Sequence, residues 1–119
     1  MSRPLRVEYE NAFYHVISRG HRREKIFRND RDRKIFLNKL SLAAERLQLK
    51  IHAYVLMSNH YHLLIETPQA NIVKAMHDIN AGYANWYRTK YRLIGSIFQG
   101  RYSHTIGFVV QKGNETYLV

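Results

Sequence analysis

The sequence predicts an α+β domain whose elements follow the order strand, helix, strand, strand, helix, strand. Three observations support this expectation. Four segments show the alternation typical of strands, two carry apolar residues at helical spacing, and no repeat or Pro/Gly-rich linker divides the 119 residues. A chain of this length is sufficient for one domain and too short for two.

The first part of the chain predicts one strand and one helix. Residues 11–19, NAFYHVISR, have apolar side chains on both faces, as in a buried strand, and Gly20 ends the pattern. Asn29 is a candidate helix cap, and Asp32 places negative charge near the positive end of the helix. Apolar residues then recur every three or four positions, which predicts an amphipathic helix over residues 31–48.

A hairpin is expected next. Residues 49–57 alternate, and the residues predicted on one side are Leu49, Ile51, Ala53, Val55 and Met57. Ser58 and Asn59 signal a short turn, and residues 60–66 form the antiparallel partner strand.

Helical spacing returns over residues 71–91, and residues 97–110 alternate again, with an interruption at Gly100. A third helix is expected to begin at Asn114. The complete order is the split β-α-β-β-α-β arrangement of ferredoxin-like folds. Right-handed crossovers would place the first and third strands in the middle of one antiparallel sheet, with both helices packed on one face.

The composition favours a protein that binds nucleic acid. Nineteen Lys and Arg against nine Asp and Glu give a formal net charge of +10, a balance that suits nucleic acid or anionic lipid. The basic run of residues 19–25 is either a solvated loop or, together with nine tyrosines, part of a phosphate-binding surface. Such contacts would give affinity and salt dependence rather than sequence choice.

Several classes of site are excluded by the composition. The chain has no cysteine, so disulfides, zinc–thiolate sites and cysteine nucleophiles are ruled out. No apolar run approaches the roughly 18 residues of a membrane span, and the first residues do not resemble a secretory signal. We therefore expect a soluble, intracellular domain.

His60 and His62 are the candidate metal-binding pair. Residues i and i+2 of a strand point the same way, so the two imidazoles project side by side. They could hold a divalent cation with a third ligand from another element, or be ordinary polar histidines on a half-exposed face. Glu66 is expected on the same face, too far along to share the cation and solvated at the strand end. His15 and His52 are expected to be structural.

Four collinear segments resemble one protein family. The segment from His52 to Pro68 closely resembles the metal-binding strand pair of the single-tyrosine HUH transposases, especially the branch of IS200-like and REP-associated tyrosine transposases. Residues 14–20, 84–87 and 98–102 match further blocks in the same order. The resemblance covers nearly the whole chain and strengthens the metal-binding interpretation of the histidine pair.

The resemblance implies an enzyme that cleaves single-stranded DNA, often at a hairpin. A divalent metal, Mg²⁺ or Mn²⁺, held by His60 and His62 would polarise the scissile phosphate, and a helix-borne tyrosine would attack it. The products are a 5′-phosphotyrosine link and a free 3′-OH. Tyr14, Tyr61 or Tyr102 could stack on unpaired bases. The residues expected to contact DNA are Arg19, Arg22, Arg23, Lys25, Arg101, Tyr102 and His104.

The expected nucleophile does not align with a residue of this chain. The resemblance places it beyond Val119, on a helix that also supplies the third metal ligand and precedes an Asn-Pro segment. Tyr117 is the candidate within the chain, although it matches a packing position of the family, and Tyr61 is expected on the opposite face of the sheet. Three explanations stay open: a shortened reading frame, a fragment of a longer protein, or use of Tyr117 on a shifted helix.

Two other functions are open at this point. One is a non-catalytic, regulatory nucleic-acid-binding module derived from a transposase, whose DNA binding would survive loss of His60 and His62. The other is a metal-dependent hydrolase of a small substrate, for which no carboxylate lies within reach of the histidines. The resemblance also leaves monomer and homodimer open, and it implies a cytoplasmic, nucleoid-associated protein of a prokaryotic cell.

Overall fold

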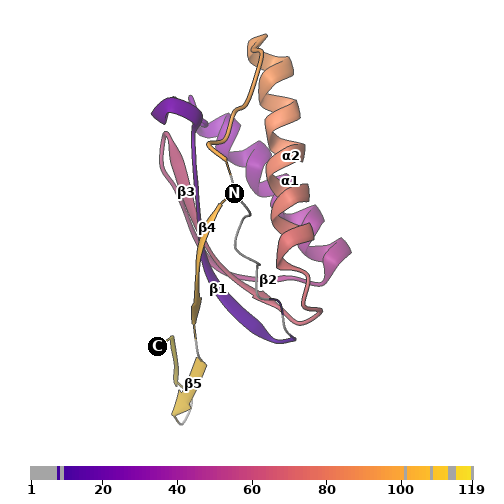
Figure 1. Ribbon diagram of the computed structural model, residues 1–119, viewed down its shortest axis with the longest axis vertical. Helices are drawn as coiled ribbons and strands as arrows, with labels where there is room; N and C mark the ends of the chain where they lie inside the picture. The colour runs from indigo at the N-terminus through magenta and orange to yellow at the C-terminus, as the bar shows by residue number, and fades with distance from the viewer. Residues whose placement is uncertain (1–7, 9, 101, 108, 113–114, 119) are drawn as a thin grey trace, which may run out of the picture.

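A four-stranded antiparallel sheet with two helices on one face forms the body of the protein (Figure 1). The structure, a computed structural model, describes residues 8, 10–100, 102–107, 109–112 and 115–118, and describes side chains only as far as residue 103. Its elements are β1 (Ala12–Arg19), the 3-10 turn η1 (His21–Arg23), α1 (Asp30–Leu47), β2 (Lys50–Leu56), β3 (His60–Thr67), α2 (Ile72–Tyr91), β4 (Ser103–Gly107), β5 (Val109–Lys112) and β6 (Glu115–Leu118).

The sheet has the strand order β2-β3-β1-β4, and each neighbouring pair is antiparallel. The prediction that the first and third strands occupy the middle is therefore confirmed. In the central pair, Ala12 lies opposite Thr67 and Arg19 lies opposite His60. The ferredoxin-like, split β-α-β-β-α-β order is confirmed with it.

The two faces of the sheet differ in burial. Alternate residues of β1 and β3 face the helices and are buried: Ala12, Tyr14, Val16, Ser18, Tyr61, Leu63, Ile65 and Thr67. Apart from the exposed Arg19, the residues between them are partly exposed on the opposite side, which we call the open face. Because side chains alternate along a strand, His15, His60 and His62 all belong to the open face.

The helices form as the sequence predicts, within one residue at each end. The Asn29 side chain caps α1 by accepting a hydrogen bond from the Asp32 N–H, at 3.0 Å. Both helices end in a left-handed residue, Gln48 after α1 and Arg92 after α2. Among the described residues, no helix has the length and apolar character needed to cross a membrane.

Strand β2 departs from the predicted alternation at His52. Its register against β3 shifts between Ile51 and Ala53. Ile51 opposes the buried Ile65, whereas Ala53 opposes a residue of the open face. The prediction of one unbroken alternation over residues 49–57 was wrong, because a β-bulge adds one residue and exchanges the two faces beyond it.

The C-terminal segment departs furthest from the prediction. Before β4, the described residues between 97 and 102 are joined to the sheet by a single bridge, between Phe98 and Gly20. Residues 115–118 form strand β6, which pairs with β5 in a hairpin beyond the end of the sheet (Figure 1). The expectation of a helix here was wrong, although Asn114 itself lies outside the described residues. β-Branched residues on both strands, and Tyr117 on β6, favour pairing over a helical turn.

A candidate metal and nucleic-acid site

Three histidines gather on the open face of the sheet. The ring centroids of His60 and His62 are 5.2 Å apart, and those of His15 and His62 are also 5.2 Å apart. His15 Nε2 and His62 Nδ1 are hydrogen-bonded at 2.9 Å. His60 Nδ1 lies 2.8 Å from Asn59 Oδ1, to which it donates. Each member of the pair is thus oriented through its Nδ1 atom.

This arrangement suits a pair of metal ligands. When His62 Nδ1 donates to His15, the lone pair of His62 Nε2 is left for a cation, and His60 Nε2 is left in the same way. Two imidazoles that share one cation at about 2.1 Å have centroids about 5 Å apart, which the pair matches. Within the described part of the chain, no three His, Asp or Glu side chains are placed so that together they could hold a metal ion. Any third protein ligand would therefore lie outside this part of the chain.

The electrostatic surroundings of His62 favour neutral imidazole. Burial, the neighbouring histidines His15 and His60, and the charge of Arg19 lower the pKa of His62 below its usual value. Neutral imidazole is the form that binds metals. Arg19 is exposed opposite His60, so a cationic group borders the pair on the same face.

The basic loop, residues 19–28, begins directly beside this pair. The side chains of Arg22, Arg23 and Lys25 are exposed, as expected for phosphate contacts. The loop is fixed to the turn that precedes His60, because Ile26 N–H donates to the Ser58 carbonyl at 2.8 Å. The cationic side chains and the histidine pair consequently share one end of the sheet.

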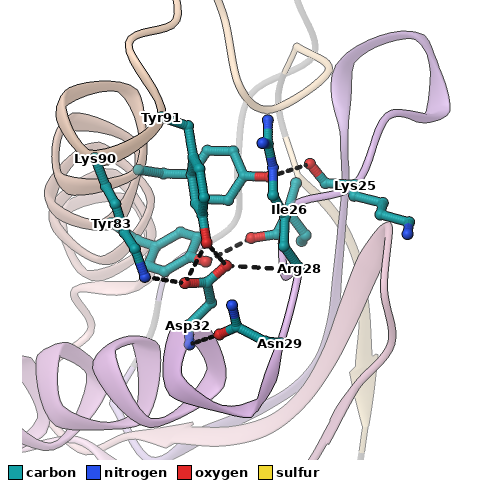
Figure 2. A network of polar contacts seen from close by, with 9 residues as sticks. Lys25, Ile26, Arg28, Asn29, Asp32, Tyr83, Lys90 and Tyr91 are labelled. Atoms are coloured by element: carbon teal, nitrogen blue, oxygen red, sulfur yellow. Dashed lines mark hydrogen bonds and ion pairs between the residues drawn. The ribbon is translucent and has the colours of Figure 1, made fainter.

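A buried carboxylate anchors the far end of this loop (Figure 2). Asp32 is fully buried and accepts hydrogen bonds from the Arg28 N–H at 2.9 Å, Lys90 Nζ at 3.1 Å and Tyr91 Oη at 2.7 Å. Burial alone would raise the pKa of Asp32, but these bonds, led by that from Tyr91, outweigh it and hold the pKa below its usual value. The carboxylate is therefore charged and joins α1, α2 and the loop.

Two tyrosines of α2 hold the loop by its main chain. Tyr83 Oη donates to the Ile26 carbonyl (Figure 2). Tyr87 Oη donates to the Lys25 carbonyl at 2.9 Å. With Tyr91 they follow at four-residue spacing, so all three lie on one face of the helix. The helical spacing of residues 71–91 predicts the helix but does not by itself indicate these bonds. The four-residue spacing of the tyrosines was the available signal.

The comparisons with known proteins give the family of this chain. Residues 8–118 match the model of the family described as "Transposase IS200 like". The chain belongs to the IS200-like transposase family. Among curated proteins, none matched the chain.

Two solved structures share the fold of this IS200-like transposase domain. A REP-associated tyrosine transposase bound to a REP hairpin matches with a TM-score of 0.68 and 15% identity, over 89% of this chain. A proposed transposase from Deinococcus radiodurans R1 matches with a TM-score of 0.66 and 18% identity, over 87% of this chain and 85% of that one. The present chain spans 62% of the length of the REP-associated protein.

Not every predicted contact residue of this transposase domain is available to DNA. Tyr14 and Tyr61 are fully buried beneath the helices, so the expectation that they stack on bases was wrong. Tyr102 is half-buried against the core. Arg101 lies outside the described residues. For His104 in β4 the structure gives only the backbone, which lies opposite Val16 of β1.

The structure also locates the two tyrosines considered as nucleophiles, Tyr61 and Tyr117. Tyr61 is on the face opposite the histidine pair, as predicted, and its hydroxyl donates to Asn80. Tyr117 lies on β6 opposite Val110, and its side chain is outside the described part. Its assignment as a nucleophile stays a prediction.

Glu66 is not the solvated strand end that was expected. Its carboxylate lies 2.9 Å from His52 Nε2, and the His52 ring stacks on Phe13 with centroids 5.3 Å apart. His52 lies on the open face beside Glu66, and the β-bulge exchanges the faces only of the residues that follow it. His15 was expected to be a structural histidine, but its hydrogen bond also orients His62.

Gly20 is required where the basic loop begins. A Cβ atom at this position would lie 2.1 Å from the Glu24 carbonyl oxygen, so the loop backbone would have to move. We expect Gly20→Ala to lower the free energy of unfolding by about 1–3 kcal/mol, measured by urea denaturation. Gly82→Ala in α2 is the matched control, because nothing lies within 4 Å of its Cβ and alanine favours helix. Equal losses in both variants would contradict the prediction.

Proposed function

We propose that this IS200-like transposase domain binds single-stranded or hairpin DNA and positions a phosphodiester beside a divalent cation held by His60 and His62. The observation that carries the proposal is the pair itself. The two rings lie side by side on the open face, each oriented through Nδ1, with Arg19 next to them. A cationic rim next to a cation site attracts and orients a nucleic-acid backbone.

The proposed partner is DNA with an unpaired or hairpin segment. Support comes from the family of the chain and from the shared fold with a transposase that was solved bound to a REP hairpin. We assign the phosphate contacts to Arg19, Arg22, Arg23 and Lys25, whose side chains are exposed. Arg101, Tyr102 and His104 remain proposed contacts.

The proposed reaction is cleavage of one phosphodiester with formation of a tyrosine–DNA link. A tyrosine oxygen attacks the phosphorus, the 3′-oxygen leaves as a 3′-OH, and the 5′-phosphate stays on the tyrosine. A bound Mg²⁺ or Mn²⁺ would supply charge stabilisation at the phosphate. The residues of this domain contribute orientation: His15 and Asn59 hold the two imidazoles, and Arg19 attracts the backbone. The proposed nucleophile is Tyr117 or a tyrosine outside these 119 residues.

The direct test is to incubate the protein with hairpin and single-stranded oligonucleotides in the presence of Mn²⁺. Binding is followed by fluorescence anisotropy, and covalent adducts are followed by denaturing gel electrophoresis. Binding without an adduct supports the DNA-binding part and indicates the non-catalytic alternative for this chain. An adduct that disappears in Tyr117→Phe would identify the nucleophile, whereas absence of DNA binding would contradict the proposal.

The basic loop should determine the salt dependence of that binding. We expect the double variant Arg22→Gln/Arg23→Gln to reduce the slope of log K against log salt by about 1.4 for single strands, because two phosphate contacts are lost. The matched control is Lys34→Gln/Lys39→Gln on α1, which removes the same charge away from the loop. Equal slopes in the two double variants would show that the loop does not contact phosphates.

A further inference from the structure

A hollow of about 400 Å³ lies between the basic loop and the segment that follows α2. One part of it is lined by Glu24, Lys25, Arg28 and Tyr87, and another by Leu93, Ser96 and Ile97. None of these residues belongs to the histidine pair. The hollow therefore joins cationic groups to an apolar wall at a place that the metal site does not use.

Arg28 is held in a fixed position at this hollow. Its Nε donates to Tyr87 Oη at 3.0 Å, and its guanidinium carbon lies 3.9 Å from the ring centroid of Tyr91 (Figure 2). The backbone N–H of Arg28 is bound by the buried Asp32. Since the side-chain bond uses Nε, both terminal nitrogens are left for a ligand within the described part of the protein. A guanidinium held in advance binds an anion at low entropic cost.

The hollow lies close to the path of DNA bound at the histidine pair. The Ile97 carbonyl accepts a hydrogen bond from the N–H of His21 at 2.8 Å, which ties the lining segment to the basic loop. The same loop is bound to the Ser58–Asn59 turn in front of His60. A strand that follows the cationic side chains of the loop away from His60 would reach Arg28.

We propose that this hollow takes one unpaired nucleotide of the bound DNA, with its phosphate on Arg28 and Lys25 and its base against Leu93 and Ile97. The inference rests on the proposed function. The volume lies within the usual range for small-ligand sites of about 300–1,000 Å³, and suits a single nucleotide. The apolar wall favours a nucleotide over inorganic phosphate, because it gives the base a surface on which to leave water.

Two variants test the hollow in different ways. Arg28→Gln removes the fixed charge, and Ser96→Trp fills the space without a change of charge at an exposed loop position. Arg31→Gln is the matched control, since Arg31 is an exposed arginine outside the lining. Affinities for a hairpin oligonucleotide with single-stranded flanks are measured by anisotropy, and circular dichroism checks that each variant is folded.

Abasic substitution along the flanks then locates the base. We expect one position at which loss of the base weakens binding to the wild-type protein about 5-fold or more, but leaves binding to Ser96→Trp unchanged. Arg28→Gln should also weaken binding more than Arg31→Gln. Equal affinity of wild type and Ser96→Trp, or no such abasic position, would overturn the inference alone. A wild-type protein that binds none of the oligonucleotides would overturn the proposed function, and this inference with it.

Discussion

Replacement of both His60 and His62 by alanine is expected to abolish Mn²⁺ binding while the protein stays folded. The two imidazoles are the proposed protein ligands, and both lie on the open face rather than in the core. Without the two imidazoles, a cation at this place would have only water molecules as ligands. Isothermal titration calorimetry with Mn²⁺ measures the binding, and thermal denaturation followed by circular dichroism reports on the fold.

Two further variants make this test specific. His77→Ala removes an exposed histidine of α2 and should bind Mn²⁺ as the wild type does. His15→Ala leaves both proposed ligands in place but removes the hydrogen bond that orients His62, so we expect about 10–100-fold weaker binding. Unchanged Mn²⁺ affinity in the His60→Ala/His62→Ala variant would place the metal elsewhere and remove the main support for the proposed chemistry.

Replacement of Asp32 by asparagine is expected to give the largest loss of stability, about 2–4 kcal/mol. Asp32 is fully buried, and its carboxylate accepts hydrogen bonds from Arg28, Lys90 and Tyr91. The neutral amide cannot balance the charge of Lys90 or accept all of these donors. A domain of this size has a total stability of about 5–15 kcal/mol, so urea denaturation will resolve the change.

The same residue should shape the response to acid. The pKa of Asp32 is lower in the folded protein than in the unfolded chain, so its contribution is complete above the usual aspartate pKa of 3.8 and is lost as the pH falls below that value. Asp32→Asn should therefore lose less stability than the wild type between about pH 4 and pH 2. Asp30→Asn is the control, because Asp30 is exposed and, within the described part of the chain, forms its ion pair with Arg33. We expect a change below about 0.5 kcal/mol for this variant. Parallel acid profiles for wild type and Asp32→Asn would contradict this role.

Local patterns in the sequence were sufficient for most of the fold. The helix bounds follow from apolar spacing and from the Asn29 cap, and the central strands follow from alternation. Two features could not be found in this way. The bulge at His52 depends on pairing with β3, and the pairing of residues 115–118 with β5 depends on a strand partner rather than on the Asn-Glu helix signal. Both are tertiary effects that override local preference.

The candidate site was predictable to a similar degree. Because the strand period is two, the shared face of His60 and His62 could be inferred from their spacing alone. His15 lies 47 positions from His62 along the chain, and only the register between β1 and β3 brings the two rings together. The burial of Tyr14 likewise depends on which face the helices cover.

The way in which α2 holds the basic loop has a consequence for how such a domain diversifies. Tyr83 and Tyr87 donate hydrogen bonds to carbonyl oxygens of the loop, and every amino acid has such an oxygen. The side chains of Arg22, Arg23 and Lys25 stay exposed. Substitutions at these outward positions alter what the loop contacts without loosening its attachment. The strength and salt dependence of the proposed phosphate contacts can therefore change over generations while the scaffold stays the same.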